Sequence, residues 1–119
     1  MSKEIISTPN APAAIGPYSQ AVKAGGFLYL SGQIPLDPQT MAVVPGCVAC
    51  QTEQALKNMS AVLESQGLTT DDVVKTTVFI KDMNDSRRST RFTLSTSRRT
   101  LPRAHASKWR VCRKTFWWR

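Results

Sequence analysis

The sequence predicts an α+β fold, in which an amphipathic helix covers a sheet of short strands. Three observations predict it. A glycine pair separates two strand-like runs, an apolar stripe of helical period extends over residues 47–66, and a β-branched run occupies residues 73–80. With 119 residues, the chain can build one domain with a two-layer core, whereas two separate cores would each be too small to be stable.

The first strands are predicted by a hairpin pattern. Residues 4–7 are a short strand candidate. Segments 19–23 and 27–31 flank Gly25 and Gly26, and this pair favours a two-residue hairpin turn because both glycines tolerate positive φ. The second strand of that hairpin begins with four mostly apolar residues, a run that suits a strand covered on both faces.

A helix is predicted from residue 47 to residue 66, where apolar positions recur with a period near 3.6. The expected buried stripe is Ala55, Met59, Val62, Leu63 and Gln66, and the residues assigned to other faces are Glu53, Lys57, Asn58 and Glu64. Gly67 is expected to follow the helix as a C′ residue in the left-handed conformation. Residues 69–72 then lead into the strand predicted over 73–80.

The charge distribution divides the chain at Asp85. Residues 1–85 contain five Lys, no Arg and all eight acidic residues, a net charge of −3. Residues 86–119 contain nine Arg, two Lys, all three Trp and no acidic residue, a net charge of +11. A change this sharp has three explanations, which are a basic arm for nucleic acid, a disordered tail, or an error of reading frame.

The cysteine and histidine content limits the possible metal chemistry. Cys47-Val-Ala-Cys50 is a single C-x-x-C motif, Cys112 stands apart, and His105 is the one histidine, so one subunit cannot supply a conventional four-ligand zinc site. A redox pair is conceivable, because C-x-x-C at a helix start can lower a thiol pKa. We interpret Cys47 and Cys50 instead as small buried hydrophobic residues near the start of the helix.

The sequence favours a cytoplasmic protein. No apolar run approaches the roughly 18–20 residues of a membrane span. The first residues, MSKE, also lack the basic and then apolar order of a signal peptide. We therefore expect no membrane association.

Three segments together resemble the Rid (YjgF) family of imine/enamine deaminases: AAIGPYSQA at 13–21, LSGQIP at 30–35 and VVKTTVFIKDMND at 73–85. The resemblance covers residues 1–85. It implies a Rid/chorismate-mutase-like mixed sheet covered by helices, and homotrimers with a site in each cleft between subunits. It also implies hydrolysis of 2-iminopropanoate and 2-iminobutanoate to 2-keto acids and ammonia, with no cofactor and no metal.

The resemblance assigns three site residues. Tyr18 matches the family's site tyrosine and is the catalytic candidate, and Ser31 and Gly32 match the substrate-binding loop. Without the resemblance, Tyr18 would be interpreted as a surface tyrosine that packs on the sheet. Ser31 and Gly32 would then mark only the end of a strand.

The family's remaining site residues are missing from the printed chain. Its clamp arginine aligns with Ala104, the following cysteine with Ala106, its site asparagine with Thr90 and its catalytic glutamate with Arg119. Suppose that one nucleotide was lost between the codons of Asp85 and Ser86. Codons for the printed residues can then be chosen so that the reading frame shifted by one nucleotide encodes family-like sequence. Residues 86–93 then correspond to FAAFNEVY, and residues 102–119 correspond to PARSCVEVARLPKDVLVE.

We therefore divide the chain into a Rid-like α+β domain, residues 1–85, and an aberrant basic tail, residues 86–119, which replaces the second helix and the closing strand. The predicted function is hydrolytic deamination of a small imino acid, impaired in the chain as printed. One alternative is an inactive or misfolded frameshift product. The other is a nucleic-acid-binding protein, because an Arg- and Trp-rich tail can neutralise phosphates and stack on bases.

Overall fold

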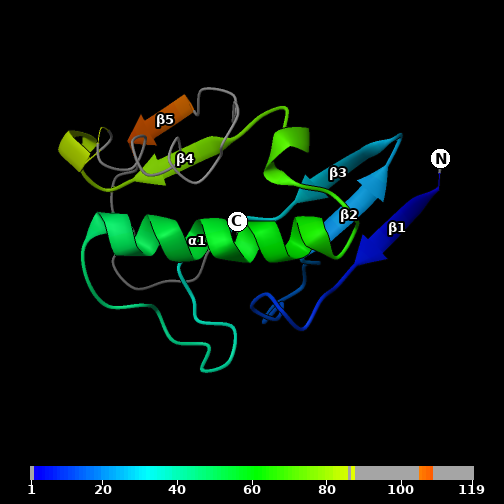
Figure 1. The fold of residues 1–119 in the computed structure, drawn as a ribbon, viewed down its shortest axis with the longest axis horizontal. Helices are drawn as coiled ribbons and strands as arrows, with labels where there is room; N and C mark the ends of the chain where they lie inside the picture. Colours follow the sequence, from blue (N-terminus) through cyan, green and yellow to red (C-terminus); the bar gives the residue numbers. More distant parts are fainter. Residues whose placement is uncertain (1, 86, 88–104, 109–119) are drawn as a thin grey trace.

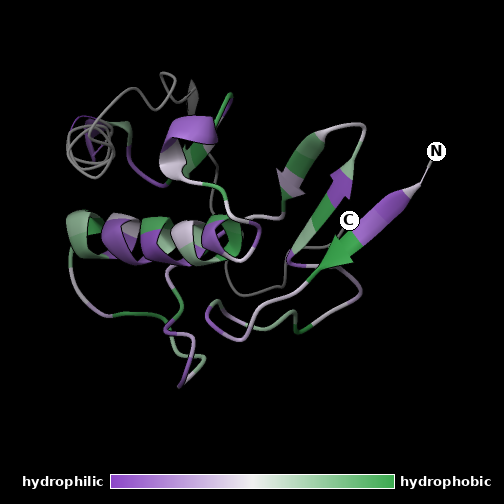
Figure 2. Ribbon diagram, turned by 45° about the vertical axis from the view of Figure 1, so that its right-hand side comes forward, coloured by the Kyte–Doolittle hydropathy of each residue, from purple (hydrophilic) through white to green (hydrophobic). Residues whose placement is uncertain are grey.

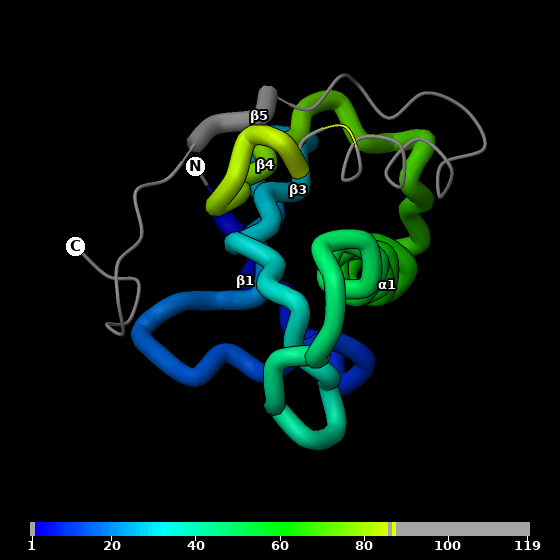
Figure 3. The backbone as a smooth tube through the Cα atoms, turned by 90° about the vertical axis from the view of Figure 1, so that its left-hand side faces the viewer, coloured from blue at the N-terminus to red at the C-terminus, as the bar shows by residue number. Residues whose placement is uncertain are grey.

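The computed structural model describes residues 2–85, Arg87 and the backbone of residues 105–108. Its elements, in order, are β1 (Lys3–Ile6), β2 (Ala21–Ala24), β3 (Phe27–Leu30), α1 (Val48–Glu64), the 3-10 helix η1 (Thr70–Asp72), β4 (Thr77–Ile80), the 3-10 helix η2 (Met83–Asp85) and β5 (His105–Lys108). Figure 1 shows α1 running alongside the strands, and Figure 3, viewed along the helix, shows the strands on one side of it. The predicted α+β fold is confirmed.

The hairpin forms where the glycine pair predicts it. Strands β1, β2 and β3 make an antiparallel sheet in that order, with Ala21 opposite Leu30 in the hairpin. Gly25 and Gly26 have φ values of 57° and 80°. A turn with positive φ at both central residues matches the right-handed twist of the flanking strands, which explains why glycine serves here.

The helix α1 ends by the predicted glycine mechanism. The N–H of Leu68 donates to the carbonyl oxygen of Leu63 at 3.0 Å, and the N–H of Gly67 donates to that of Glu64 at 3.0 Å. Gly67 has φ of 68°. These two bonds and the left-handed glycine make a Schellman motif, so Gly67 is the C′ residue, as predicted.

The prediction for Asn58 was wrong, because this residue faces the interior of the molecule and is only 1% exposed. Its Nδ2 donates to the carbonyl oxygens of Ile34 at 3.2 Å and Leu36 at 2.8 Å, and its Oδ1 accepts from Gln54 Nε2 at 2.9 Å. A buried amide is stable only when its polar atoms are paired. Asn58 therefore fastens the loop after β3 to the helix.

The core lies between the helix and one face of the three-stranded sheet. Its buried members are Ile6, Ala11, Ala21 and Val62, with Leu28, Leu30 and Ala61 packed against them. The expectation that the run 27–30 is covered on both faces was wrong, since Phe27 is 55% and Tyr29 62% exposed. Side chains alternate across a strand, and in this chain the helix covers only one face. Figure 2 shows hydrophobic residues on the strands as well as on the helix.

Strand β4 is shorter than the run 73–80 predicted. Val73 closes η1, with its N–H donating to the carbonyl oxygen of Thr70 at 3.3 Å, and strand pairing begins only at Thr77. The partner is β5, which pairs in parallel and lies within the segment predicted to be aberrant. Parallel strands need a long crossover, and 24 residues separate β4 from β5. Residues 88–104, where the tail is predicted to replace the family's second helix, lie outside the described residues.

One buried side chain, Gln20, attaches the N-terminal loop to the sheet. Its Oε1 accepts from the Thr8 N–H at 2.6 Å. Its Nε2 is directed at the carbonyl oxygens of Thr8 at 3.0 Å, Ala11 at 3.3 Å and Pro12 at 2.8 Å. Gln20 is 5% exposed and immediately precedes β2. These bonds therefore hold the backbone of residues 8–12 against the start of that strand.

We expect Gln20→Ala to lower the free energy of unfolding by about 2–3 kcal/mol, because it leaves buried loop carbonyls and an N–H without partners. Urea unfolding measures the change. The matched control is Gln39→Ala, which truncates an exposed glutamine in a surface turn and should change stability by less than about 0.5 kcal/mol. Equal effects of the two substitutions would contradict the role given to Gln20.

Candidate functional site

The three predicted site residues come together at one end of the hairpin. Beyond the last strand pair, the N–H of Ser31 donates to the carbonyl oxygen of Gln20 at 3.0 Å. The Ser31 hydroxyl also donates to the carbonyl oxygen of Ser19 at 2.6 Å. These bonds continue the antiparallel contact past β2 and β3. Tyr18, the residue before Ser19, is thereby held beside the segment of Ser31 and Gly32.

The direction of the chain at Tyr18 is set by a tight turn. Its N–H donates to the carbonyl oxygen of Gly16 at 2.8 Å, which closes a three-residue γ-turn around Pro17. The proline ring restricts φ to a value close to the one such a turn needs. Tyr18 is half-buried, so its ring contacts the protein while part of the side chain reaches solvent.

Ser31 and Gly32 differ in what they offer to a ligand. The half-buried Ser31 hydroxyl donates its proton to Ser19, so it can still accept a hydrogen bond through its oxygen. Gly32 is exposed, and a Cβ placed on it would meet no atom within 4 Å. Its backbone is therefore open to close approach by a small molecule.

The described part of the site lacks the charged groups that the family chemistry needs. Residues 1–85 contain no Arg, so no guanidinium can come from them. The positions aligned with the family's asparagine, arginine and glutamate (Thr90, Ala104 and Arg119) lie outside the described residues. Ala106, aligned with the family's cysteine, is in β5 opposite Val78.

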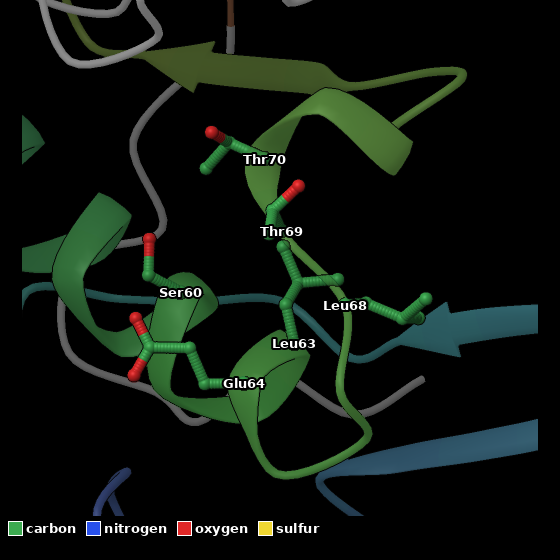
Figure 4. Close-up of a pocket in the computed structure, with 6 residues that line it drawn as sticks. All are labelled: Ser60, Leu63, Glu64, Leu68, Thr69 and Thr70. Atoms are coloured by element: carbon green, nitrogen blue, oxygen red, sulfur yellow. The ribbon is translucent and has the colours of Figure 1, made fainter.

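A pocket of about 180 Å³ lies elsewhere, between the last turns of α1 and η1. It is lined by Ser60, Leu63, Glu64, Leu68, Thr69 and Thr70. Figure 4 shows Ser60 and Glu64 projecting from the helix and the two threonines from the segment that starts η1. None of the three predicted site residues lines it, so this pocket is separate from the end of the hairpin.

The interpretation of Cys47 and Cys50 as buried residues was wrong, because both side chains are exposed. Cys47 is the N-cap of α1, and the two sulfur atoms lie 3.5 Å apart. The apolar stripe could have indicated this. When the stripe is extended from Ala55 towards the N-terminus, the next positions on the same helix face are Thr52 and Val48, which are half-buried. Cys47 and Cys50 do not lie on that face.

Two further findings concern the described residues only. No group of three or more His, Cys, Asp or Glu side chains is placed to hold a metal ion in this part of the chain. In the same part, the helices are too short or too polar to cross a lipid bilayer.

We expect Gly32→Ala to leave the free energy of unfolding within about 0.5 kcal/mol of the wild-type value, because the new methyl group would enter open space. The matched control is Gly26→Ala, which also enters open space but at φ of +80° and should cost about 1 kcal/mol. Urea unfolding separates the two. A large loss for Gly32→Ala would mean that its backbone is enclosed.

Known proteins resemble both the sequence and the fold. The sequence model of a family described as Endoribonuclease L-PSP matches residues 8–115. The 2-iminobutanoate/2-iminopropanoate deaminase of Escherichia coli K12 is 55% identical over 85 residues, which are 71% of this chain and 65% of that protein. The chain spans about two thirds of the length of the curated relatives it matches.

Solved structures agree with these matches. The Rid family protein YyfA of Yersinia pestis superposes with a TM-score of 0.86 at 42% identity, covering 91% of this chain and 86% of that one. Escherichia coli TdcF, crystallised with bound serine, gives a TM-score of 0.81 at 37% identity, covering 89% and 85%. The resemblance drawn from the three sequence segments is thus confirmed, and the chain belongs to the Rid (YjgF) family, whose sequence model carries the description Endoribonuclease L-PSP.

Proposed function

We propose that this protein hydrolyses reactive 2-imino acids, such as 2-iminopropanoate and 2-iminobutanoate, together with their enamine tautomers. Water adds to the imine carbon, and ammonia leaves to give the 2-keto acid, so the reaction needs no redox cofactor. The observation that carries the proposal is the pairing of Ser31 with Ser19 and Gln20, which holds Tyr18 beside Gly32 within the family match. The deaminase name of the Escherichia coli relative supports the substrate class.

The three retained residues have distinct proposed roles. Tyr18 offers a phenolic hydroxyl that can donate a hydrogen bond to the substrate or to the attacking water. Gly32 offers an open backbone, where a small planar substrate can approach closely. Ser31 acts mainly by positioning, because its hydroxyl is bonded to the neighbouring strand.

The full reaction also needs a guanidinium for the substrate carboxylate and a carboxyl group to activate water. We propose that the gene encodes both, and that the printed chain leaves the correct frame after Asp85. The change from a net charge of −3 to +11 at that residue supports this proposal. The matches with curated relatives span 83 to 86 residues, close to the length of the segment before the break. The chain as printed is then impaired.

We also propose a homotrimer with sites between subunits. The outward face of the β1–β2–β3 sheet is apolar around Ile5, Phe27 and Tyr29, which are 66%, 55% and 62% exposed. Phe27 and Tyr29 stack obliquely, with ring centroids 6.3 Å apart. A contiguous apolar face of this kind is typical of an interaction surface. A second copy covering it would also bring new side chains towards the hairpin.

The proposed partners are thus an imino acid and further copies of this chain, in the cytoplasm, where reducing thiol pools keep cysteines free. Nucleic-acid binding is the second candidate, favoured by the basic tail and by the family's endoribonuclease description. It is less well supported, because residues 1–85 carry a net charge of −3. Salt-dependent RNA binding that disappears on deletion of residues 86–119 would favour it.

We expect the chain with one nucleotide restored after codon 85 to accelerate ammonia release from imino acid generated by an amino acid oxidase. In that chain, Tyr18→Phe should slow turnover about tenfold or more, the effect of losing one hydrogen bond in the transition state. Tyr29→Phe is the matched control and should be nearly neutral.

Two outcomes would contradict the proposal. Unchanged turnover in Tyr18→Phe would remove this residue from the site. An active protein whose intact mass equals that of the printed sequence would refute the reading-frame error.

We expect Tyr29→Lys to shift the restored chain from trimer to monomer, because it places a charge in the apolar face that the proposed assembly buries. Light scattering coupled to size-exclusion chromatography gives the mass in solution. Val43→Lys changes a similarly exposed apolar residue, 56% exposed, outside the three-stranded sheet and should leave the trimer intact. A trimer that tolerates Tyr29→Lys would place the interface elsewhere.

A further inference from the structure

The proposed deaminase function does not use the paired thiols at the start of α1. Cys47 is the N-cap residue and Cys50 lies three positions further, so both side chains project from the same side of the first turn. Their sulfur atoms are 3.5 Å apart and both side chains are exposed. A disulfide needs these atoms at about 2.05 Å, and small side-chain rotations span the difference.

The loop before the helix leaves Cys50 accessible. Gly46 lies directly against it, and a Cβ on Gly46 would stand 3.5 Å from the Cβ and the Sγ of Cys50. Gly46 has φ of +119°, a conformation that other residues rarely adopt. A residue with a side chain would therefore be strained here and would partly cover the thiol. Glycine keeps the approach to Cys50 open.

The electrostatic environment favours a thiolate at Cys47. The backbone N–H of Cys50, the Cys50 thiol and the backbone N–H of Ala49 lower the pKa of Cys47 below its ordinary value. The first turn of α1 contains no acidic residue, and Glu53 further along is paired with Lys57 at 2.9 Å. No helical carboxylate therefore opposes the negative sulfur in that turn.

We propose that Cys47 and Cys50 are a redox-active dithiol, which closes to an intrachain disulfide on reaction with a low-molecular-weight disulfide such as oxidised glutathione. The Cys47 thiolate attacks one sulfur of the disulfide, a new S–S bond forms, and one glutathione thiolate leaves and takes up a proton. Cys50 then loses its proton and attacks the Cys47 sulfur, which releases the second glutathione. Two protein thiols are oxidised and one glutathione disulfide is reduced to two thiols.

The test treats the full-length chain with oxidised glutathione, blocks free thiols with iodoacetamide and digests with trypsin. Lys23 and Lys57 bound one tryptic peptide, 24–57, that carries both cysteines, whereas Cys112 falls in the separate peptide 111–113. In the wild-type chain, peptide 24–57 should lose the mass of two hydrogen atoms and escape alkylation.

The single variants distinguish the attacking thiol from the resolving thiol. Cys50→Ser should retain glutathione on Cys47, because the second exchange step is removed. Cys47→Ser should react about tenfold more slowly, because Cys50 lacks the N-cap position. Equal urea midpoints of the variants and the wild type serve as the control for folding.

Three results would overturn the proposal. In the treated wild-type chain, these are complete alkylation of both cysteines, or stable glutathione on either cysteine without ring closure. The third is an equal reaction rate for the two variants. Because this readout is a peptide mass, it is independent of deaminase activity. Failure of either proposal can therefore be recognised separately.

Discussion

The bonds of the Gln20 side chain are the constraint on which the candidate site depends. An amide with three carbonyl oxygens and one N–H around it is stable in the interior because both its donors and its acceptor are paired. The same residue uses its backbone carbonyl to accept from the N–H of Ser31. Gln20 thus fixes the N-terminal loop on one side and the end of the hairpin on the other. Tyr18, two residues earlier, has little freedom to leave that position.

A second buried amide, Asn58, performs the corresponding task from the helix. Its side chain donates hydrogen bonds to the carbonyl oxygens of Ile34 and Leu36, which belong to the loop that follows Gly32. The core itself is small and built partly of alanines, so the apolar contacts alone would leave these loops weakly positioned. Two paired amides, each nearly inaccessible to solvent, supply the directional contacts that apolar packing lacks.

Two features of residues 2–85 have no partner within that segment. The outer face of the three-stranded sheet exposes aromatic and aliphatic side chains, and residues 1–85 supply no guanidinium to the site end of the hairpin. The proposed trimer would cover the apolar face, whereas the proposed change of reading frame after Asp85 would account for the missing guanidinium. The thiol pair belongs to neither surface. It lies at the helix start, where both side chains are exposed beside the backbone N–H groups of the first turn.

The sequence by itself determined the elements that depend on interactions between residues close together in the chain. The glycine pair forced the hairpin turn, Gly67 closed the helix, and the helical period placed Val62 in the core, because backbone conformation and periodicity act within a few residues. The three site residues came from the family resemblance, and the structure added how they are brought together. The tertiary structure alone decided that Asn58 is buried, since the two carbonyl oxygens that accept from it lie more than twenty residues away. It also decided that Cys47 and Cys50 are exposed, because exposure depends on which face of a helix the rest of the chain covers.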